Sequence, residues 1–256
     1  MIKMKEERVD KNMNKTFCVA DLHGMYSLWR QVIESLDETD TLYILGDAAD
    51  RGLDGWKIIK EALRDPRIIY IRGNHDQMLL DSWKDEWCGY CNYLWMCNGG
   101  NTTFEALIQD SDYEIYLKEL ARTKLYHCYE NKEGKKIHLS HAGFTLLENN
   151  EIPNSEDLLW DRYHIGDGCD WWPKTNPNDY VVHGHTGCVS SVFKHRSYVA
   201  KDGDMIWNIT KTVLRYTHGH KICIDGRCFI TNQIAILDLD TLDEKVFFDN
   251  NSFSAE

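Results

Sequence analysis

The sequence lacks several features that define common classes of protein. No stretch approaches about 18 apolar residues, so we expect no membrane-spanning helix. Residues 1–15 are polar and charged without an apolar centre, and we predict an N-terminal extension there, not a signal peptide. Basic residues are in deficit, because 29 Lys and Arg face 41 Asp and Glu and give a formal net charge of −12. This balance disfavours a general nucleic-acid binder, which must neutralise phosphates with Lys and Arg.

A disulfide framework is absent as well. The nine cysteines are an odd number, scattered over 256 residues, and we predict reduced thiols in a cytoplasmic protein. We find no internal repeat, no linker and no low-complexity tract. The hydrophobic share of 43% is enough for a sizeable core, and we therefore predict a single domain over residues 16–249.

The polar residues suited to chemistry follow three short, apolar, β-prone runs. These runs are Thr16–Ala20, Thr41–Leu45 and Arg67–Ile71. Asp47 follows Asp21 by 26 positions and Asn74 follows Asp47 by 27, close to the roughly 30 residues of a strand–helix–strand unit. The spacing predicts three parallel strands whose carboxyl ends meet at one sheet edge. We expect this edge to hold Asp21, His23, Asp47, Asp50, Arg51, Asn74 and His75.

Periodicity predicts the other elements. Helices are expected over residues 25–36, 55–63, 102–109 and 112–123, with Asp54 as the N-cap of the second. Strands are expected over residues 125–129, 135–139, 180–182, 191–199, 205–209, 221–225, 233–239 and 245–248. We predict turn or loop roles for His183, His218, His220 and Asp225.

Residues 83–100 are rich in Trp, Tyr and Cys. Cys88, Cys91 and Cys97 would suit a zinc site, but structural zinc usually takes four ligands from two pairs, and a second pair is absent. We favour an aromatic cap that packs over the sheet edge near the active site.

Oxygen and imidazole donors recur after the predicted strands. His141 follows the strand at 135–139, and His185 follows the strand at 180–182. Mixed oxygen and imidazole donors suit Mn, Fe or Zn, while Mg and Ca prefer nearly all oxygen. Six ligands are too many for one open catalytic ion but suit two ions that share a carboxylate. The candidate ligands are Asp21, His23, Asp47, Asn74, His141 and His185.

Five motifs occur in one order: Asp-x-His, Gly-Asp-x-x-Asp-Arg-Gly, Gly-Asn-His-Asp, His-Ala-Gly and Gly-His-Thr. Over Phe17 to Leu239 the chain therefore resembles the phosphoprotein phosphatase (PPP) family within the calcineurin-like metallophosphoesterases. In size and motif style it is most similar to small bacterial and phage serine/threonine protein phosphatases. The resemblance implies an α/β fold, a sandwich of two mixed β-sheets flanked by α-helices.

The resemblance also implies a centre of two divalent metal ions, with manganese expected and iron or zinc as alternatives. One ion would be held by Asp21, His23 and Asp47. The second would be held by Asp47 as the bridge together with Asn74, His141 and His185.

The remaining roles implied by the resemblance concern the phosphate and the leaving group. His75 would be the general acid, and Asp50 would orient it and keep it protonated. Arg51, Arg162 and Asn74 would bind the substrate phosphate. The expected reaction is hydrolysis of a phosphomonoester by in-line attack of metal-bound hydroxide.

Two departures bear on substrate. Leu53 stands where the family usually has Pro, and Asp76 stands where eukaryotic phosphoprotein phosphatases have Glu. Asp at that position is frequent among bacterial members, including symmetrical diadenosine tetraphosphatases. Those enzymes often lack the carboxylate that this chain keeps as Asp50.

Three functions therefore compete. A phosphoserine or phosphothreonine protein is the first candidate substrate. A dinucleoside polyphosphate is the second, with adenines stacked on Trp83, Trp87, Tyr90 or Trp95. The third interpretation, a non-catalytic scaffold, would require loss of a ligand or of the His75–Asp50 pair, and all of these residues are present.

Overall fold

Two five-stranded sheets form the centre of the molecule in the computed structural model, which describes residues 14–144, 153–162, 179–188, 212–216 and 220–249. The first sheet has the order β10-β9-β1-β2-β3 and the second the order β4-β5-β6-β8-β7. The strands are β1 (Thr16–Val19), β2 (Thr41–Leu45), β3 (Ile68–Ile71), β4 (Tyr126–Glu130), β5 (Lys136–Ser140), β6 (Tyr180–His183), β7 (Leu214–Arg215), β8 (Lys221–Cys223), β9 (Gln233–Asp238) and β10 (Glu244–Phe248). The helices are α1 (Tyr26–Glu34), α2 (Gly55–Arg64), α3 (Asn74–Lys84), α4 (Gly89–Cys97), α5 (Asn101–Leu107), α6 (Tyr113–Leu120), α7 (Ser155–Trp160) and α9 (Cys228–Thr231).

Both sheets are mixed, as expected from the sequence. Strands β1, β2 and β3 are parallel neighbours, β9 is antiparallel to β1, and β10 is antiparallel to β9. In the second sheet β5, β6 and β8 are parallel, while β4 and β7 are antiparallel to their neighbours. The predicted α/β sandwich of two mixed sheets with flanking helices is therefore confirmed.

Strand β2 shows why the central runs of the sequence are continuously apolar. Its side chains alternate between the two faces of the sheet. Leu42 and Ile44 join the cluster that packs under the helices, whereas Tyr43 and Leu45 join the cluster between the two sheets. A strand covered on both faces loses the alternation of polar and apolar residues that marks a half-exposed strand.

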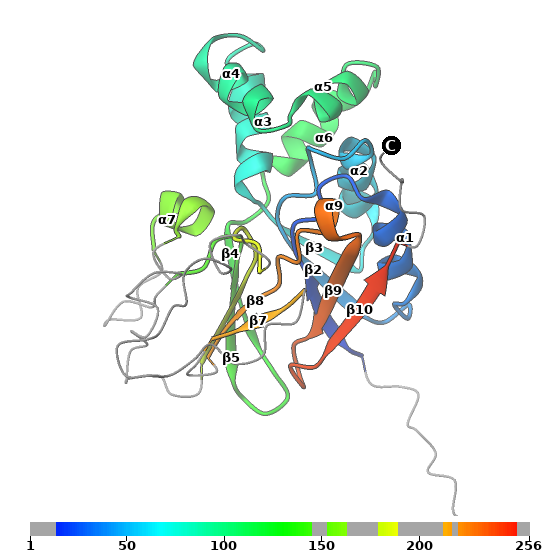
Figure 1. Ribbon diagram of the computed structural model, residues 1–256, viewed down its shortest axis with the longest axis vertical. Coiled ribbons are helices and arrows are strands. Elements are labelled where there is room, and N and C mark those ends of the chain that lie inside the picture. Colours follow the sequence, from blue (N-terminus) through cyan, green and yellow to red (C-terminus); the bar gives the residue numbers. More distant parts are fainter. Residues whose placement is uncertain (1–13, 145–152, 163–178, 189–211, 217–219, 250–256) are drawn as a thin grey trace, which may run out of the picture.

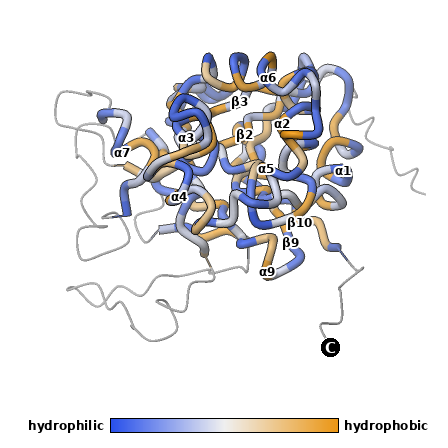
Figure 2. Tube along the Cα trace, turned by 90° about the horizontal axis from the view of Figure 1, so that it is seen from above, coloured by the Kyte–Doolittle hydropathy of each residue, from blue (hydrophilic) through white to orange (hydrophobic). Residues whose placement is uncertain are grey.

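Helices cover the first sheet on the side away from the second sheet. Figure 1 shows α1 and α2 beside this sheet, with α3, α4 and α5 at one end of the molecule. In Figure 2 the turns of α2, α3 and α6 carry both blue and orange segments, as expected of helices with one buried face. No helix within the described ranges has both the length and the apolar character needed to cross a membrane.

Two helices differ from the expectations. Helix α3 begins at Asn74, directly after the Gly73 N-cap, so Asn74 and His75 lie in its first turn and not in a loop. Helix α4 occupies the centre of the aromatic segment 83–100, where no element was predicted. Asp54 is the N-cap residue of α2, as predicted, but its side chain makes no capping hydrogen bond. The strands predicted over residues 191–199 and 205–209 lie outside the described residues.

Candidate active site

The carboxyl ends of five strands converge on one site. Asp21 and His23 follow β1, Asp47, Asp50 and Arg51 follow β2, and Asn74 and His75 follow β3. The second sheet contributes His141 after β5 and His185 after β6. The loops after β1 and β2 are tied to each other, because the backbone N–H groups of Asp21 and His23 donate to the carbonyls of Gly46 and Asp47 over 3.1 and 2.9 Å. The loop after β3 is joined to them through the Asp47 and Asp76 carboxylates.

Backbone strain is concentrated in these loops. Six of the eleven described non-glycine residues with positive φ are predicted site residues. They are Asp21, His23, Asp47, Asp50, Arg51 and His185. Left-handed conformations cost about 1–3 kcal/mol each for such residues and persist where the surrounding structure enforces them. Strain at this density is typical of a functional site.

Gly73 explains how closely β2 and β3 approach each other here. A Cβ atom at Gly73 would collide with the carboxylate oxygen Oδ1 of Asp47. Gly46, with φ +84°, would collide in turn with the backbone of Gly73. Because neither Gly46 nor Gly73 has a side chain, the loops after β2 and β3 can approach closely and leave room for the Asp47 carboxylate.

Asp47 lies at the centre of the site. Its Oδ1 accepts a hydrogen bond from the backbone N–H of His75 over 2.9 Å. Its Oδ2 lies 3.3 Å from Nε2 of His141 and 3.8 Å from Nε2 of His23. Two groups of side chains have the geometry to hold a cation, one formed by His23, Asp47 and His75 and the other by Asp21, Asp47 and His141. Because Asp47 belongs to both groups, it has the position that a bridging ligand requires.

Asn74 brings the second sheet into the same cluster. Its Oδ1 lies 2.7 Å from Nε2 of His141 and 3.0 Å from Nδ1 of His185. All three side chains are buried. His185 Nε2 is buried and has no well-formed hydrogen bond among the residues that the structure describes.

The His23 and His141 rings are oriented by backbone carbonyls. Nδ1 of His23 lies 2.9 Å from the carbonyl of Ala49, and Nδ1 of His141 lies 2.8 Å from that of Leu45. When Nδ1 of each ring donates its proton to the backbone carbonyl, the lone pair of Nε2 points into the cluster. This arrangement is typical of metal-binding histidines.

Burial and mutual charge perturb the titration of this cluster. Burial and the neighbouring Asp225 raise the pKa of Asp21 well above its ordinary value. Burial opposes the ionised form of Asp47 too, but the imidazoles of His141 and His75 hold its pKa well below that value. Burial lowers the pKa of His185 to about 2, so its imidazole is neutral. Burial disfavours the charged form of His141, but the carboxylates of Asp47 and Asp21 outweigh it and raise the pKa of His141 to about 10. A divalent cation could replace the proton that Asp47 and His141 share, and the buried carboxylate and imidazole donors present therefore fit a metal centre.

His75 and Asp50 form a buried pair beside the candidate ligands. Nδ1 of His75 lies 2.7 Å from Oδ2 of Asp50, and both side chains are at most 3% exposed. Arg51 lies on the other side of the His75 ring, with Nη2 3.0 Å from Nε2. A guanidinium can only donate, so Nε2 accepts here and Nδ1 carries the proton that is donated to Asp50.

The two predicted phosphate-binding arginines flank the cluster. Arg51 Nη1 lies 2.6 Å from Nε2 of His23. Arg162 follows α7 and donates to Oγ1 of Thr186 over 3.1 Å, beside His185. Burial lowers the pKa of the Arg162 guanidinium. The two cations thus approach the cluster from the first and the second sheet, respectively.

Residues that the sequence analysis had not placed in the site also line it. Asp225 follows β8 and is buried, and burial raises its pKa to about 6. Phe229 of α9 lies under the Arg51 guanidinium, 4.5 Å from ring centroid to Cζ. Asp225 follows a strand in the same way as Asp21 and Asp47, and this signal could have identified it. Phe229 has no such signal, because its approach to Arg51 depends on the fold.

Asp76 has a structural position, not a substrate-facing one. Its Oδ2 accepts hydrogen bonds from the backbone N–H groups of Asp47 and Gly73 over 3.1 and 2.9 Å. Its Oδ1 accepts from the hydroxyl of Tyr70 over 3.0 Å. Asp76 therefore links the loop that carries Asp47 to the loop that carries Gly73. Because these structural contacts engage both of its carboxylate oxygens, the choice of Asp at this position carries little information about the substrate.

The zinc alternative finds no support in the geometry. The two candidate cation groups among the described residues contain no cysteine. Cys88 and Cys97 are exposed and Cys91 is partly exposed. His220 lies outside the site, where Nδ1 is 3.1 Å from the carbonyl of Asp179, and His218 is not among the described residues.

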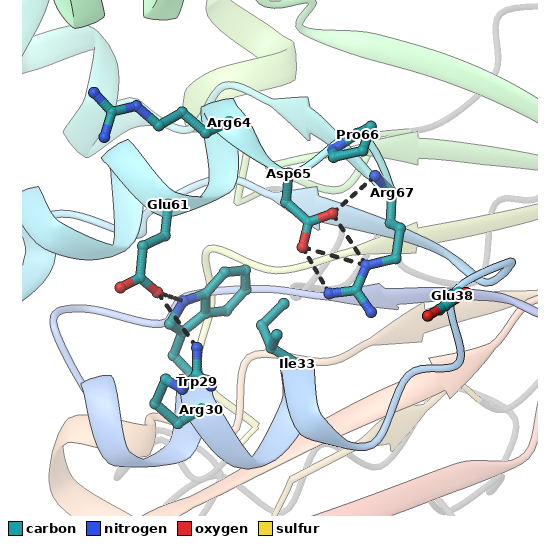
Figure 3. Close-up of a pocket in the computed structure, with 9 residues that line it drawn as sticks. All are labelled: Trp29, Arg30, Ile33, Glu38, Glu61, Arg64, Asp65, Pro66 and Arg67. Atoms are coloured by element: carbon teal, nitrogen blue, oxygen red, sulfur yellow. Dashed lines mark hydrogen bonds and ion pairs between the residues drawn. The ribbon is translucent and has the colours of Figure 1, made fainter.

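A separate cavity of about 510 Å³ lies between α1, α2 and the start of β3. In Figure 3 the Asp65 carboxylate binds Arg67, and the Glu61 carboxylate faces Trp29 and Arg30. Because these two carboxylates already have partners, the cavity offers no comparable set of convergent ligands.

The fold and the strand-end cluster define the architecture of a metallophosphoesterase. Residues 15–189 match the family model of calcineurin-like phosphoesterases, and the chain therefore belongs to this family. The expected enzyme class, a metal-dependent phosphatase, agrees with this membership.

Solved structures show the same fold at low sequence identity. A protein proposed to be a diadenosine tetraphosphatase is 15% identical with a TM-score of 0.61, over 94% of this chain and 96% of that one. A metallophosphoesterase from Sphaerobacter thermophilus is 12% identical with a TM-score of 0.54, over 92% and 88%. A protein serine/threonine phosphatase from Saccharomyces cerevisiae is 13% identical with a TM-score of 0.51, over 94% and 82%. No curated protein sequence matches the chain significantly.

Proposed function

We propose that this chain is a two-metal phosphomonoesterase of the PPP type, and that its substrate is a phosphoserine or phosphothreonine protein. The His75–Asp50 pair is the observation that carries the proposal, because its 2.7 Å contact is buried beside the candidate metal ligands. We assign Asp21, His23 and Asp47 to one ion and Asp47, Asn74, His141 and His185 to the other. When bound, the two ions would neutralise charge on the phosphate and lower the pKa of water toward ~7.

The leaving group explains why the pair favours a protein substrate. Serine and threonine leave a phosphate ester as poor, strongly basic alkoxides, which need a proton in the transition state. A dinucleoside polyphosphate releases a phosphate oxygen, which is far less basic. In the proposed mechanism Arg51, Arg162 and Asn74 bind the phosphate, so Nε2 of His75 no longer accepts from Arg51 and can carry a second ring proton. His75 gives this Nε2 proton to the leaving oxygen, while Asp50 holds the ring through Nδ1.

The aromatic segment argues against a dinucleoside polyphosphate whose adenines stack on its aromatic side chains. Trp95 is fully buried, and Trp83 and Trp87 pack against the core. Of the four residues considered for adenine stacking, Tyr90 is the exposed one, at 73%. A binding platform for two adenines needs more free aromatic surface than this.

The finer features of the proposal follow from the same interpretation. We propose manganese as the native ion, a single domain over residues 16–249 and a small bacterial or phage type of enzyme. We also propose a cytoplasmic location, where the eight described cysteines would stay as free thiols.

The decisive experiment compares three substrates after metal removal with a chelator and reconstitution with Mn²⁺. An aryl phosphate, a phosphoserine peptide and diadenosine tetraphosphate are assayed side by side. We expect Mn²⁺-dependent turnover of the aryl phosphate, and of the peptide well above the dinucleotide. Preference for diadenosine tetraphosphate would assign the second function. Inactivity on all three with metals bound would favour the scaffold.

A further inference from the structure

We propose that Trp95 is a positioning residue for the Asp50–His75 pair; this inference rests on the proposed function. The indole N–H of Trp95 lies 2.9 and 3.1 Å from the two carboxylate oxygens of Asp50. The Asp50 oxygen Oδ2 is also the partner of His75 Nδ1. Trp95 and Asp50 both have no exposed surface. A buried tryptophan therefore donates to the same carboxylate that holds His75.

The Asp50 carboxylate depends on few donors. Within the described part of the chain, the side-chain hydrogen bonds to it come from His75 and Trp95. A buried carboxylate oxygen without a donor is costly, and the carboxylate turns to recover one. The indole N–H spans both oxygens, so it fixes the carboxylate plane. The plane in turn fixes the direction from which His75 Nδ1 is held.

The chain around Trp95 holds the backbone of the same site. The Thr103 hydroxyl oxygen accepts a hydrogen bond from the Asp50 N–H over 2.8 Å. The Gly99 carbonyl accepts one from the Arg51 N–H over 3.1 Å. Asp50 and Arg51 have φ of 71° and 66°, which leaves this dipeptide strained. Residues 95–103 therefore support both the side chain and the backbone of the strained pair.

The ring position of Trp95 is itself enforced by packing. A Cβ atom at Gly100 would lie 2.5–2.6 Å from three atoms of the indole, Nε1 included. The Trp95 ring also packs edge-on to Phe104, at 88° and 6.2 Å between centroids. The indole N–H thus has one direction available, and that direction is toward Asp50.

A purely structural role for Trp95 is the competing explanation, and the chain offers a matched control for it. Trp56 is also buried and also donates its indole N–H to a carboxylate, that of Asp110, over 2.9 Å. Asp110 lies outside the site and pairs with Lys60. Replacement of Trp56 by Phe therefore removes a buried tryptophan donor without touching the Asp50–His75 pair.

The test measures kcat and KM for Trp95→Phe, Trp56→Phe and wild type, all loaded with Mn²⁺. The substrates are p-nitrophenyl phosphate, with a good leaving group, and a phosphoserine peptide, with a poor one. We expect Trp95→Phe to lower kcat on the peptide by about 10–100-fold, the range for loss of a supporting hydrogen bond. KM should be unchanged and the loss on the aryl ester several-fold smaller. Trp56→Phe should keep the wild-type ratio of the two activities.

Two further variants separate a positioning role from misfolding. Gly100→Ala keeps the indole N–H but displaces the ring, and it should give the same leaving-group-dependent loss. Trp95→Phe in an Asp50→Asn background should cost nothing more, because the carboxylate that Trp95 orients is gone. Equal losses on the two substrates, or additive losses in the double variant, would overturn the inference. Failure of the proposed function has a different signature, since wild type would then show no Mn²⁺-dependent turnover of either ester.

Discussion

The two sheets contribute unequally to the site. The first sheet supplies seven of the predicted residues within positions 21–75, and the loops after β1 and β2 are joined by direct backbone hydrogen bonds. The second sheet supplies His141 and His185, with Asp225 beside them. The shared carboxylate, the His75–Asp50 pair and Arg51 all lie on the first sheet. Under the proposed function, the first sheet would hold the reaction machinery and the second would complete one cation group.

The strongest test of this contrast is Asp47→Asn, on the first sheet. Asp47 belongs to both candidate cation groups, so its loss should weaken both metal sites at once. We expect the metal content to fall toward zero and turnover to fall by more than the ~10–100-fold cost of losing an outer-shell partner, roughly 10³-fold. Elemental analysis and the aryl phosphate assay measure both effects. Two full equivalents of metal in this variant would contradict a shared ligand.

His75→Asn should separate metal binding from proton transfer on the same sheet. His75 lies within the candidate group of His23 and Asp47, but we assign it to the leaving group and not to an ion. We therefore expect metal content to stay at the wild-type value and turnover of the phosphoserine peptide to fall by ~10²–10⁴-fold. The aryl ester serves as the internal control, because its good leaving group needs less protonation. Unchanged kcat and KM on the peptide would show that His75 is not the general acid.

His185→Asn extends the comparison to the second sheet. The variant should lose one equivalent of metal and keep the other, because His185 contacts Asn74 and lies outside the candidate group around His23. Turnover should fall by at least ~10–100-fold. His220→Asn is the matched control, since His220 lies in the same sheet region and outside the site. Loss of both metals from the His185→Asn variant would show that the two metal sites do not bind their ions independently.

The sequence predicted the parts of the molecule that follow local rules. β-Prone runs closed by polar motifs identified β1, β2 and β3, and strand order then predicted which side chains meet. The strands predicted over residues 125–129, 135–139, 233–239 and 245–248 correspond to β4, β5, β9 and β10, which pair in the structure as two hairpins. These features depend on neighbours along the chain, which a single sequence displays.

Features that depend on distant contacts could not be predicted in this way. Trp95 donates to a carboxylate 45 positions away, and Phe229 meets a guanidinium from the far end of the chain. The start of α3 at Asn74 was missed because its N-cap is a glycine, which lacks the usual capping side chain. Asp225 was missed although its position after a strand followed the rule used for Asp21.

The smallest expected effect concerns the stability of the second sheet, away from the metals. His138 on β5 is 7% exposed, and its Nδ1 lies 2.7 Å from the Tyr126 hydroxyl. Burial lowers its pKa below the ordinary 6.5, with Asp179 opposing the shift. The folded chain therefore binds this proton less tightly than the unfolded chain. Stability should fall as the pH drops through 6.5, by at most about 1.4 kcal/mol per pH unit for one proton.

His138→Gln isolates this effect from the other histidines. Gln keeps an acceptor for the Tyr126 hydroxyl but cannot bind the extra proton. We expect the drop in Tm of the Mn²⁺-loaded protein between pH 7.5 and 5.5 to be smaller in the variant than in wild type. Turnover at pH 7.5 should be unaffected, because His138 does not touch the site. An identical pH dependence of Tm in the two proteins would mean that His138 binds its proton equally well in the folded and unfolded states. The acid sensitivity of the second sheet would then have to arise elsewhere.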